Sequence, residues 1–149
     1  MNLFKVDEKK DETKLHPKYL LLKNEFQLKY ERQIIEGWSE GFVDRDNKFV
    51  TEFQDTFHSS FWELFLFKLF SAMGVEMDQS HQMPDFFITN PIKVYVEAVV
   101  SNISQYGRKE KERNFDDQLS MLIPPYLQKG FYEFLDESII RNASALKTK

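Results

Sequence analysis

Three acidic side chains lie inside, or at the edge of, segments of the sequence that are otherwise apolar. Glu63 interrupts the run 61–67, Asp85 precedes a Phe-Phe-Ile triplet, and Glu97 lies in the valine-rich segment 94–100. Ionised carboxylates are rarely buried unless they are paired, hydrogen-bonded or bound to a metal, because removing their water costs several kcal/mol. Three such acids in consecutive segments therefore indicate a cation-binding site.

Each acid also has a purely structural interpretation. Asp85 follows a proline and could cap a turn, and Glu97 could lie on the solvent face of an edge strand. Glu63 could form a salt bridge with one of three basic residues: His58, Lys68 or Arg141. The sequence leaves these alternatives open for each acid taken alone, and only their common order favours a shared site.

The first element that the sequence predicts is a long N-terminal helix. His16-Pro17 provides a helix start, because proline is tolerated in the first turn, and glycines at 37 and 41 end the helix. Apolar residues recur at a spacing of four, which predicts one packed face. That face consists of Leu22, Phe26, Tyr30, Ile34 and Trp38.

A second helix is predicted from residue 51 to about residue 73. Thr51 and Gln54 have the spacing of a capping box, and Gly74 is placed to end the helix. From 61 to 70 the segment is apolar on nearly every side, which predicts a buried central helix. Only Glu63 and Lys68 interrupt it, and five residues apart they lie on different faces, so each needs another partner.

Short strands are predicted after this helix. The segments 75–77, 85–89 and 93–100 are rich in strand-forming residues, and Asn90-Pro91 forms a turn between the last two. Alternation along the last strand puts one set of residues on the core face and another on the opposite face, where chemistry would occur. The core set is Val94, Val96, Ala98 and Val100, and the opposite set includes Tyr95, Glu97 and Val99.

The composition fits one mixed α+β domain over residues 1–149. Hydrophobic residues make up 42% of the 149 residues, and 15 phenylalanines predict a bulky core. We expect a charged lead-in at 1–15, a helical extension at 16–50 and a core at 51–149, with a last short helix at 137–146. The absence of cysteine, of a secretory leader and of a long apolar run predicts a cytoplasmic protein that does not enter a membrane. A net charge of −4 argues against a protein that coats nucleic acid electrostatically.

The order of these features resembles the signature of a nuclease superfamily. The helix contains Phe61-Trp62-Glu63-Leu64, the next motif is Pro84-Asp85-Phe86, and Val96-Glu97-Ala98 follows on a strand. Residues 51–101 are similar in this respect to the PD-(D/E)XK, or restriction-endonuclease-like, superfamily. The resemblance implies a restriction-endonuclease-like core with a buried helix and a small mixed sheet.

The same resemblance implies a chemistry and a role for each acid. Asp85 and Glu97 would bind a divalent metal together with the carbonyl of Ala98, and Glu63 would contact the metal or its water. Oxygen ligands suit Mg²⁺, with Mn²⁺ as the substitute. The implied activity is metal-dependent hydrolysis of phosphodiester bonds in nucleic acid, DNA in the first place, by an endonuclease-like enzyme.

Two departures from the family pattern favour an alternative. The family has a lysine two positions after the strand glutamate, where this chain has Val99, and Lys68 or Lys93 would have to replace it. The family core also continues with a further helix and strand, so we expect a truncated or degenerate member. The alternative is a non-catalytic nuclease-like module that binds a partner or forms a homo-oligomer, for which the sequence offers C-terminal aromatic residues: Phe131, Tyr132 and Phe134.

Overall fold

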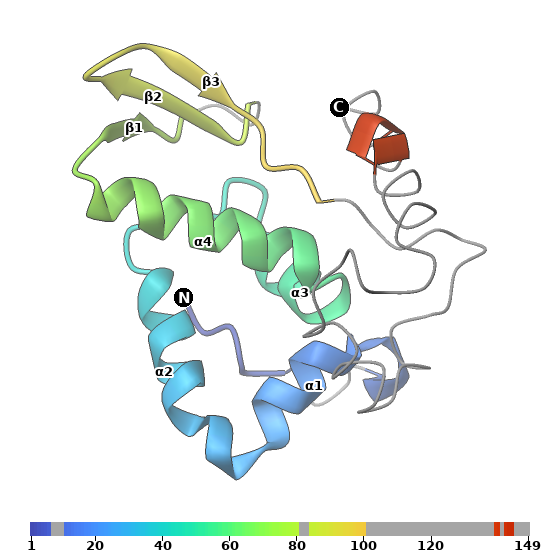
Figure 1. Ribbon diagram of the computed structural model, residues 1–149. Coiled ribbons are helices and arrows are strands. Elements are labelled where there is room, and N and C mark those ends of the chain that lie inside the picture. Colours follow the sequence, from blue (N-terminus) through green and yellow to red (C-terminus); the bar gives the residue numbers. More distant parts are fainter. Residues whose placement is uncertain (7–10, 81–83, 101–138, 141, 145–149) are drawn as a thin grey trace, which may run out of the picture. The chain divides into compact units, whose positions relative to one another are not determined.

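The computed structural model describes residues 1–6, 11–80, 84–100, 139–140 and 142–144. These residues form a mixed α+β protein in which helices precede a small antiparallel sheet (Figure 1). In chain order the elements are η1 (Glu12–Lys14), α1 (Pro17–Asn24), η2 (Phe26–Leu28), α2 (Lys29–Trp38), α3 (Phe49–Asp55), α4 (His58–Ala72), β1 (Glu76–Asp78), β2 (Phe86–Asn90) and β3 (Val94–Val96).

The chain divides into two compact units, Met1–Ala98 and Val99–Lys149. In the second unit the described residues 139–140 and 142–144 are helical, which agrees with the last helix expected from the sequence. Arg141 and the aromatic residues at 131, 132 and 134 lie outside the described residues. No helix in the described ranges combines the length and apolar character that crossing a membrane would require.

The predicted long N-terminal helix is wrong, because the chain bends between α1 and α2. His16 caps α1 as expected, through Nδ1, but Glu25 ends this helix with an extended backbone. Arg32 then donates from Nη1 to the carbonyl oxygens of Leu22 at 2.6 Å and of Glu25 at 2.8 Å. The bend resets the helical period, so the predicted apolar face is not continuous. Its members Phe26, Tyr30 and Ile34 are exposed, and α2 buries Ile35 instead.

The second predicted helix is two helices. Phe57 interrupts it with a φ of 36°, which separates α3 from α4 while the Phe57 ring stays buried. The predicted capping box is also wrong, because α3 begins at Phe49 and Oδ1 of Asp44 accepts hydrogen bonds from the N–H groups of Lys48 and Phe49. The expected end of α4 is confirmed, since Gly74 has a φ of 72°, a conformation that favours glycine.

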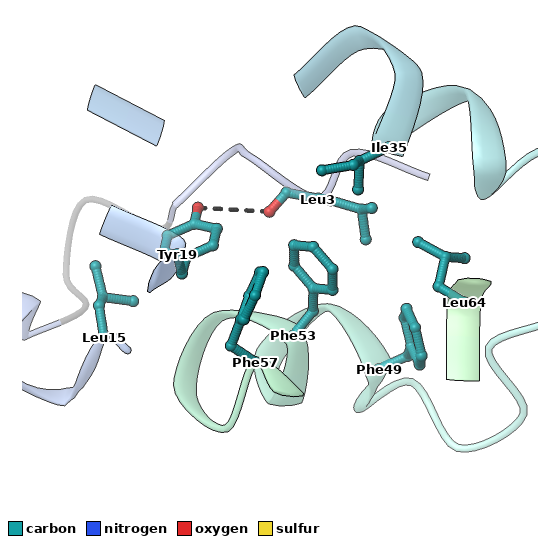
Figure 2. Close-up of a cluster of buried hydrophobic side chains, with 8 residues drawn as sticks. All are labelled: Leu3, Leu15, Tyr19, Ile35, Phe49, Phe53, Phe57 and Leu64. Atoms are coloured by element: carbon teal, nitrogen blue, oxygen red, sulfur yellow. Dashed lines mark hydrogen bonds between the residues drawn. The ribbon is translucent and has the colours of Figure 1, made fainter. Parts of the chain in front are cut away.

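The N-terminal residues pack into the core, which the predicted charged lead-in did not anticipate. Leu3 is fully buried among side chains of α1, α2, α3 and α4 (Figure 2). Its N–H donates to Oε1 of Glu36, and its carbonyl oxygen accepts from the hydroxyl of Tyr19 and from Nε2 of Gln54. Gln54, which the capping box would have placed at a helix end, is buried and satisfies the backbone of this segment. The remaining members of the cluster are Leu15, Ile35, Phe49, Phe53, Phe57 and Leu64.

The sheet is a three-stranded antiparallel meander in the order β1-β2-β3. Phe86 of β2 packs with Phe67 of α4 in a second buried cluster, which also contains Ala98. On the other face Phe87 stacks on Tyr95, whose side chain is exposed. The predicted outward face is therefore confirmed for Tyr95 on β3, and Ala98, two residues beyond the end of this strand, is buried as predicted. The parallel strand that a mixed sheet requires is not among the described residues.

Candidate functional site

Asp85 and Glu97 flank the point where the β2–β3 ladder ends. Phe86 pairs with Val96 as the last pair on this side of the antiparallel ladder, in which the residue number falls on β2 as it rises on β3. Asp85 directly precedes the first residue of β2, and Glu97 directly follows the last residue of β3. The two acids therefore belong to the same end of the ladder.

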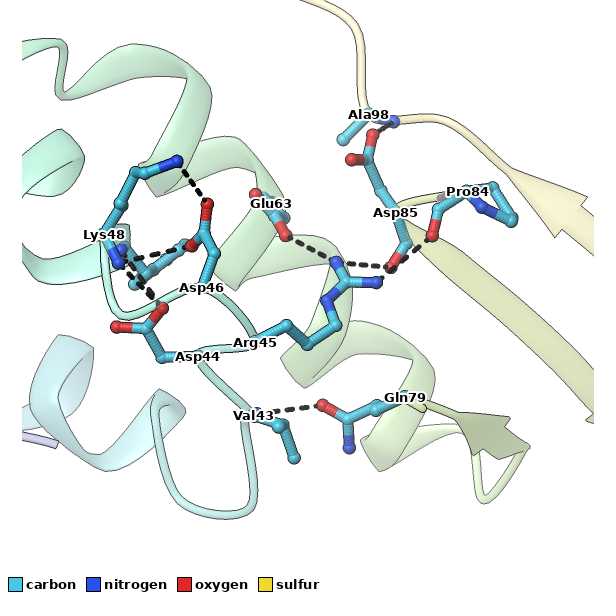
Figure 3. Close-up of polar contacts among 11 residues, drawn as sticks. Val43, Asp44, Arg45, Asp46, Lys48, Glu63, Gln79, Pro84, Asp85 and Ala98 are labelled. Carbon is cyan, nitrogen blue, oxygen red and sulfur yellow. Dashed lines mark hydrogen bonds and ion pairs between the residues drawn. The ribbon is translucent and has the colours of Figure 1, made fainter. Parts of the chain in front are cut away.

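A hydrogen bond fixes the carboxylate of Asp85 at this position. The N–H group of Ala98 donates to Oδ2 of Asp85 over 2.7 Å (Figure 3). A short bond from a backbone N–H to a carboxylate is charge-assisted and orients the acid strongly. Ala98 directly follows Glu97, so the Asp85 carboxylate lies against the backbone next to the second acid. Glu97 itself is exposed, whereas Asp85 is half-buried.

Arg45 reaches the same corner from the loop between α2 and α3. Its Nη1 donates to the carbonyl oxygen of Pro84 at 3.3 Å, and its Nη2 donates to that of Asp85 at 3.4 Å (Figure 3). The loop is held by its own side chains, because Oδ1 of Asp44 and Oδ1 of Asp46 both accept from the N–H of Lys48. A fixed loop can therefore place a guanidinium under the Pro84–Asp85 bend, about 40 residues further along the chain.

Glu63 pairs with Arg45. Nη2 of Arg45 lies 3.7 Å from Oε1 of Glu63, and their side chains are only 17% and 21% exposed. The three salt-bridge partners considered from the sequence, His58, Lys68 and Arg141, did not include this arginine. Nothing in the local sequence indicates it, because residues 45 and 63 belong to different elements and meet only through the tertiary fold.

The structure thus places Asp85 and Glu97 at the same end of the β2–β3 ladder and gives Glu63 a cationic partner. Glu63 belongs to α4, which covers the sheet face of Phe86 and Ala98, whereas strand alternation assigns Glu97 to the face of Tyr95. Contact of Glu63 with a metal or its water stays a prediction. The two candidate substitute lysines, Lys68 and Lys93, are exposed, and Arg45 is the basic residue that donates to the carbonyl oxygen of Asp85.

A polar cavity of about 280 Å³ adjoins this pair. It lies beside Arg45 and Glu63 and is lined by further acids of the loop and of α3, namely Asp44, Asp46 and Glu52. The side chain of Lys48, at 3.2 Å, is the main cause that lowers the pKa of Asp46 below its ordinary value. The cavity is open to solvent on one side, so a small polar molecule or ion has access to Arg45.

Asp85 and Glu97 are the candidate metal ligands at the end of the ladder. Within the described residues, no group of three or more His, Cys, Asp or Glu side chains is arranged to hold a metal ion. Mg²⁺ and Mn²⁺ prefer hard oxygen ligands, and Mg²⁺ is usually bound by one or two carboxylates together with several waters. Metal binding by these two acids stays a prediction.

Comparison of the chain with family models, with curated proteins and with solved structures found no match. The resemblance to the PD-(D/E)XK superfamily therefore stays a prediction from the sequence motifs.

Proposed function

We propose that this chain is a restriction-endonuclease-like domain that binds Mg²⁺ through Asp85 and Glu97 and hydrolyses phosphodiester bonds in nucleic acid. The main support is the Asp85 carboxylate, which accepts from the Ala98 N–H and so lies against the backbone next to Glu97. A second support is the element order, in which a helix containing an acid precedes a strand that directly follows Pro84-Asp85. This order of helix acid, Pro-Asp and second strand acid is the part of the superfamily pattern that the chain shares, whereas the described sheet is antiparallel throughout.

Asp85 and Glu97 would bind the metal at the end of the ladder, and the carbonyl group of Ala98 is the backbone oxygen that the resemblance adds. A bound Mg²⁺ supplies Lewis acidity toward a phosphodiester and lowers the pKa of an attacking water. The exposure of Glu97 leaves this end of the sheet accessible to a polymer as large as a nucleic acid. A deep pocket would not allow that access, so an open ladder end suits this substrate class.

Arg45 and Glu63 have a positioning role in this proposal. The guanidinium donates to the carbonyl groups of Pro84 and Asp85, which fixes the backbone bend from which the Asp85 side chain extends. Glu63 compensates the charge of Arg45 in surroundings where both side chains are mostly buried. Together they connect α4 to the bend. In the local charge balance, Arg45 takes the place of the lysine that the family has at the position of Val99. It does not replace that lysine in contact with the nucleophile.

The second candidate function is a nuclease-like module that binds a partner without cutting it. The observation that favours it is the pairing of Glu63 with Arg45, since an acid whose charge an arginine compensates contributes less charge to a metal site. The valine at 99 and the net charge of −4 agree with this candidate. Metal binding by Asp85 and Glu97 is compatible with both functions, so only strand cleavage separates them.

Nicking of supercoiled plasmid DNA tests the catalytic proposal. The wild-type chain with Mg²⁺ or Mn²⁺ is expected to convert supercoiled DNA to the open circle, and EDTA is expected to stop the reaction. Asp85→Asn and Glu97→Gln should reduce nicking to background, whereas Glu40→Gln, an exposed acid at the end of α2, should leave it unchanged. Parallel reactions with single-stranded DNA and with RNA define the substrate. Absence of cleavage of all three polymers by a folded, metal-loaded wild type would favour the non-catalytic module.

A further inference from the structure

The junction between α3 and α4 has a strained backbone. Phe57 has a φ of 36° and a ψ of −62°, and the N–H group of His58 donates to the carbonyl oxygen of Thr56 over 2.6 Å. This is a γ-turn with a positive central φ, a form that is rare and unfavourable for a residue with a side chain. Contacts with neighbouring elements must therefore hold Phe57 in this conformation.

The sequence around the junction favours a single helix instead. The segment 51–73 has the apolar pattern of one continuous helix, and Gly74 is placed to end it. In such a helix the carbonyl oxygen of Gln54 would accept from the N–H group of His58, four residues later. In the structure that oxygen accepts from the N–H group of His16, over 2.8 Å. The start of α1 therefore uses a carbonyl group that a continuous helix would use within itself.

The N-terminal segment 1–6 holds the bent arrangement. Nε2 of Gln54 donates to the carbonyl oxygens of Leu3 and Lys5, each at 3.1 Å. The side chain of Leu3 is fully buried in the same cluster as Phe57 (Figure 2). Contacts of the N-terminal segment thus converge on the end of α3, directly before the strained residue.

The buried ring of Phe57 also holds the junction. It is only 5% exposed, and its centroid lies 5.2 Å from that of Phe53 and 5.3 Å from that of Phe61. The imidazole of His16 stacks on it at 5.8 Å. Burial of this large apolar ring offsets the unfavourable backbone. The bend between α3 and α4 therefore depends on tertiary packing and not on the local sequence.

We propose that the α3–α4 junction is a hinge and that the segment 1–6 is its latch. When this segment leaves the core, Phe57 adopts a helical φ, and α3 and α4 join into one helix. α3 then swings away from α4. Phe49 and Glu63, which line one cavity in the bent state, would be about 21 Å apart along a straight helix. The proposal is independent of the metal site and does not require catalysis.

The distance between two spin labels tests the hinge, because the chain has no cysteine of its own. Thr51→Cys on α3 and Ala72→Cys at the end of α4 replace exposed residues. A straight helix would separate these positions by about 32 Å, and a bent one by less. Pulsed electron paramagnetic resonance should give only the shorter distance in the labelled full chain. Leu3→Ala should populate the longer distance, whereas Ile92→Ala, at a site 65% exposed between β2 and β3, should not.

A matched pair of substitutions at Phe57 tests the hinge without changing the latch. Phe57→Ala and Phe57→Gly remove the same ring, but alanine favours a helix, whereas glycine accepts a positive φ. Phe57→Ala should therefore populate the longer distance, and Phe57→Gly should keep the shorter one. Circular dichroism and melting curves show which variants are folded.

Either arm of the experiment can overturn the proposal. A folded Leu3→Ala variant that gives only the shorter distance would show that the segment 1–6 is not a latch. The same distance in the two Phe57 variants would show that the junction is not a hinge. If one variant does not fold, the other arm decides.

Discussion

The N–H group of Ala98 and the carboxylate of Asp85 are joined by a hydrogen bond of 2.7 Å across the end of the β2–β3 ladder. This contact connects the residue before β2 to the second residue after β3, beyond their last regular pair, Phe86 with Val96. It ties the two segments together past the end of the ladder. It also orients the Asp85 carboxylate against the backbone next to Glu97, the second acid of the proposed metal site.

The contribution of this hydrogen bond to stability can be separated from the charge of Asp85. Asp85→Asn keeps an oxygen that can accept from Ala98 N–H, so its free energy of unfolding should stay close to that of the wild type. Asp85→Ala leaves the N–H group without this acceptor and should lose about 1–2 kcal/mol. Urea unfolding in the presence of EDTA measures both. Equal stability of the two variants would show that the bond contributes nothing.

The ion pair of Arg45 and Glu63 is expected to contribute measurably because both side chains are mostly buried. Arg45→Met leaves a half-buried Glu63 carboxylate without its cation and should reduce the free energy of unfolding by about 1–3 kcal/mol. The double variant Arg45→Met with Glu63→Leu should recover part of this loss, since neither charge then remains. A double-mutant cycle from urea unfolding gives the coupling energy.

The exposed pair of Lys48 and Asp46 is the control for this cycle. Lys48→Met should leave the free energy of unfolding almost unchanged, because solvent screens exposed ion pairs. If Arg45→Met has as small an effect as Lys48→Met, the idea that Arg45 fixes the Pro84–Asp85 bend fails.

The N-terminal segment should be essential for stability although the sequence suggested otherwise. Leu3→Ala removes a fully buried side chain from the main core cluster and should cost about 2–5 kcal/mol. Ile92→Ala makes a comparable change at a site that is 65% exposed and should cost less than about 1 kcal/mol. Thermal and urea unfolding measure both losses. If Leu3→Ala costs as little unfolding free energy as Ile92→Ala, the packing of Leu3 in the core is contradicted.

Tyr19 predicts how stability changes at high pH. Burial, and next the negative charge of Glu36, raise the pKa of Tyr19 from 10.0 to about 12. The folded state therefore keeps this proton where the unfolded chain releases it. The corresponding stability is fully present below pH 10 and is lost as the pH rises toward 12. In that pH range the unfolding free energy of the wild type should fall relative to that of Tyr19→Phe, which has no hydroxyl to ionise. A pH-independent difference would mean that Tyr19 ionises equally in both states.

Local signals in the sequence predicted the sheet and its faces well. The turn at Asn90-Pro91 and the alternation along 93–100 depend only on neighbouring residues. The turn lies between β2 and β3 as predicted. The alternation correctly predicts that Ala98 is buried and that Tyr95 is exposed. The strand itself is shorter, from Val94 to Val96. Its predicted continuation included Glu97 and Ala98, which lie beyond the end of the strand, and the Ala98 N–H donates to the Asp85 carboxylate instead.

Features that depend on distant contacts could not be predicted. The helical period from Leu22 to Trp38 is regular, but Arg32 binds the carbonyl oxygens at the Glu25 bend and the period does not continue through it. Gln54 has capping-box spacing, yet its side chain satisfies the backbone of Leu3, 51 residues away. Arg45 was missed for the same reason, because its partner Glu63 and the Asp85 carbonyl group approach it only after α4 and β2 have packed.

The central claim is that Asp85 and Glu97 together bind a divalent cation, and titration of Mn²⁺ followed by electron paramagnetic resonance tests it most directly. The wild type should bind the ion saturably, Asp85→Asn and Glu97→Gln should each weaken binding about tenfold or more, and Glu52→Gln, which removes one acid from the neighbouring cavity, should change it little. A wild type that binds no ion, or an Asp85→Asn variant that binds as tightly as the wild type, would contradict the claim.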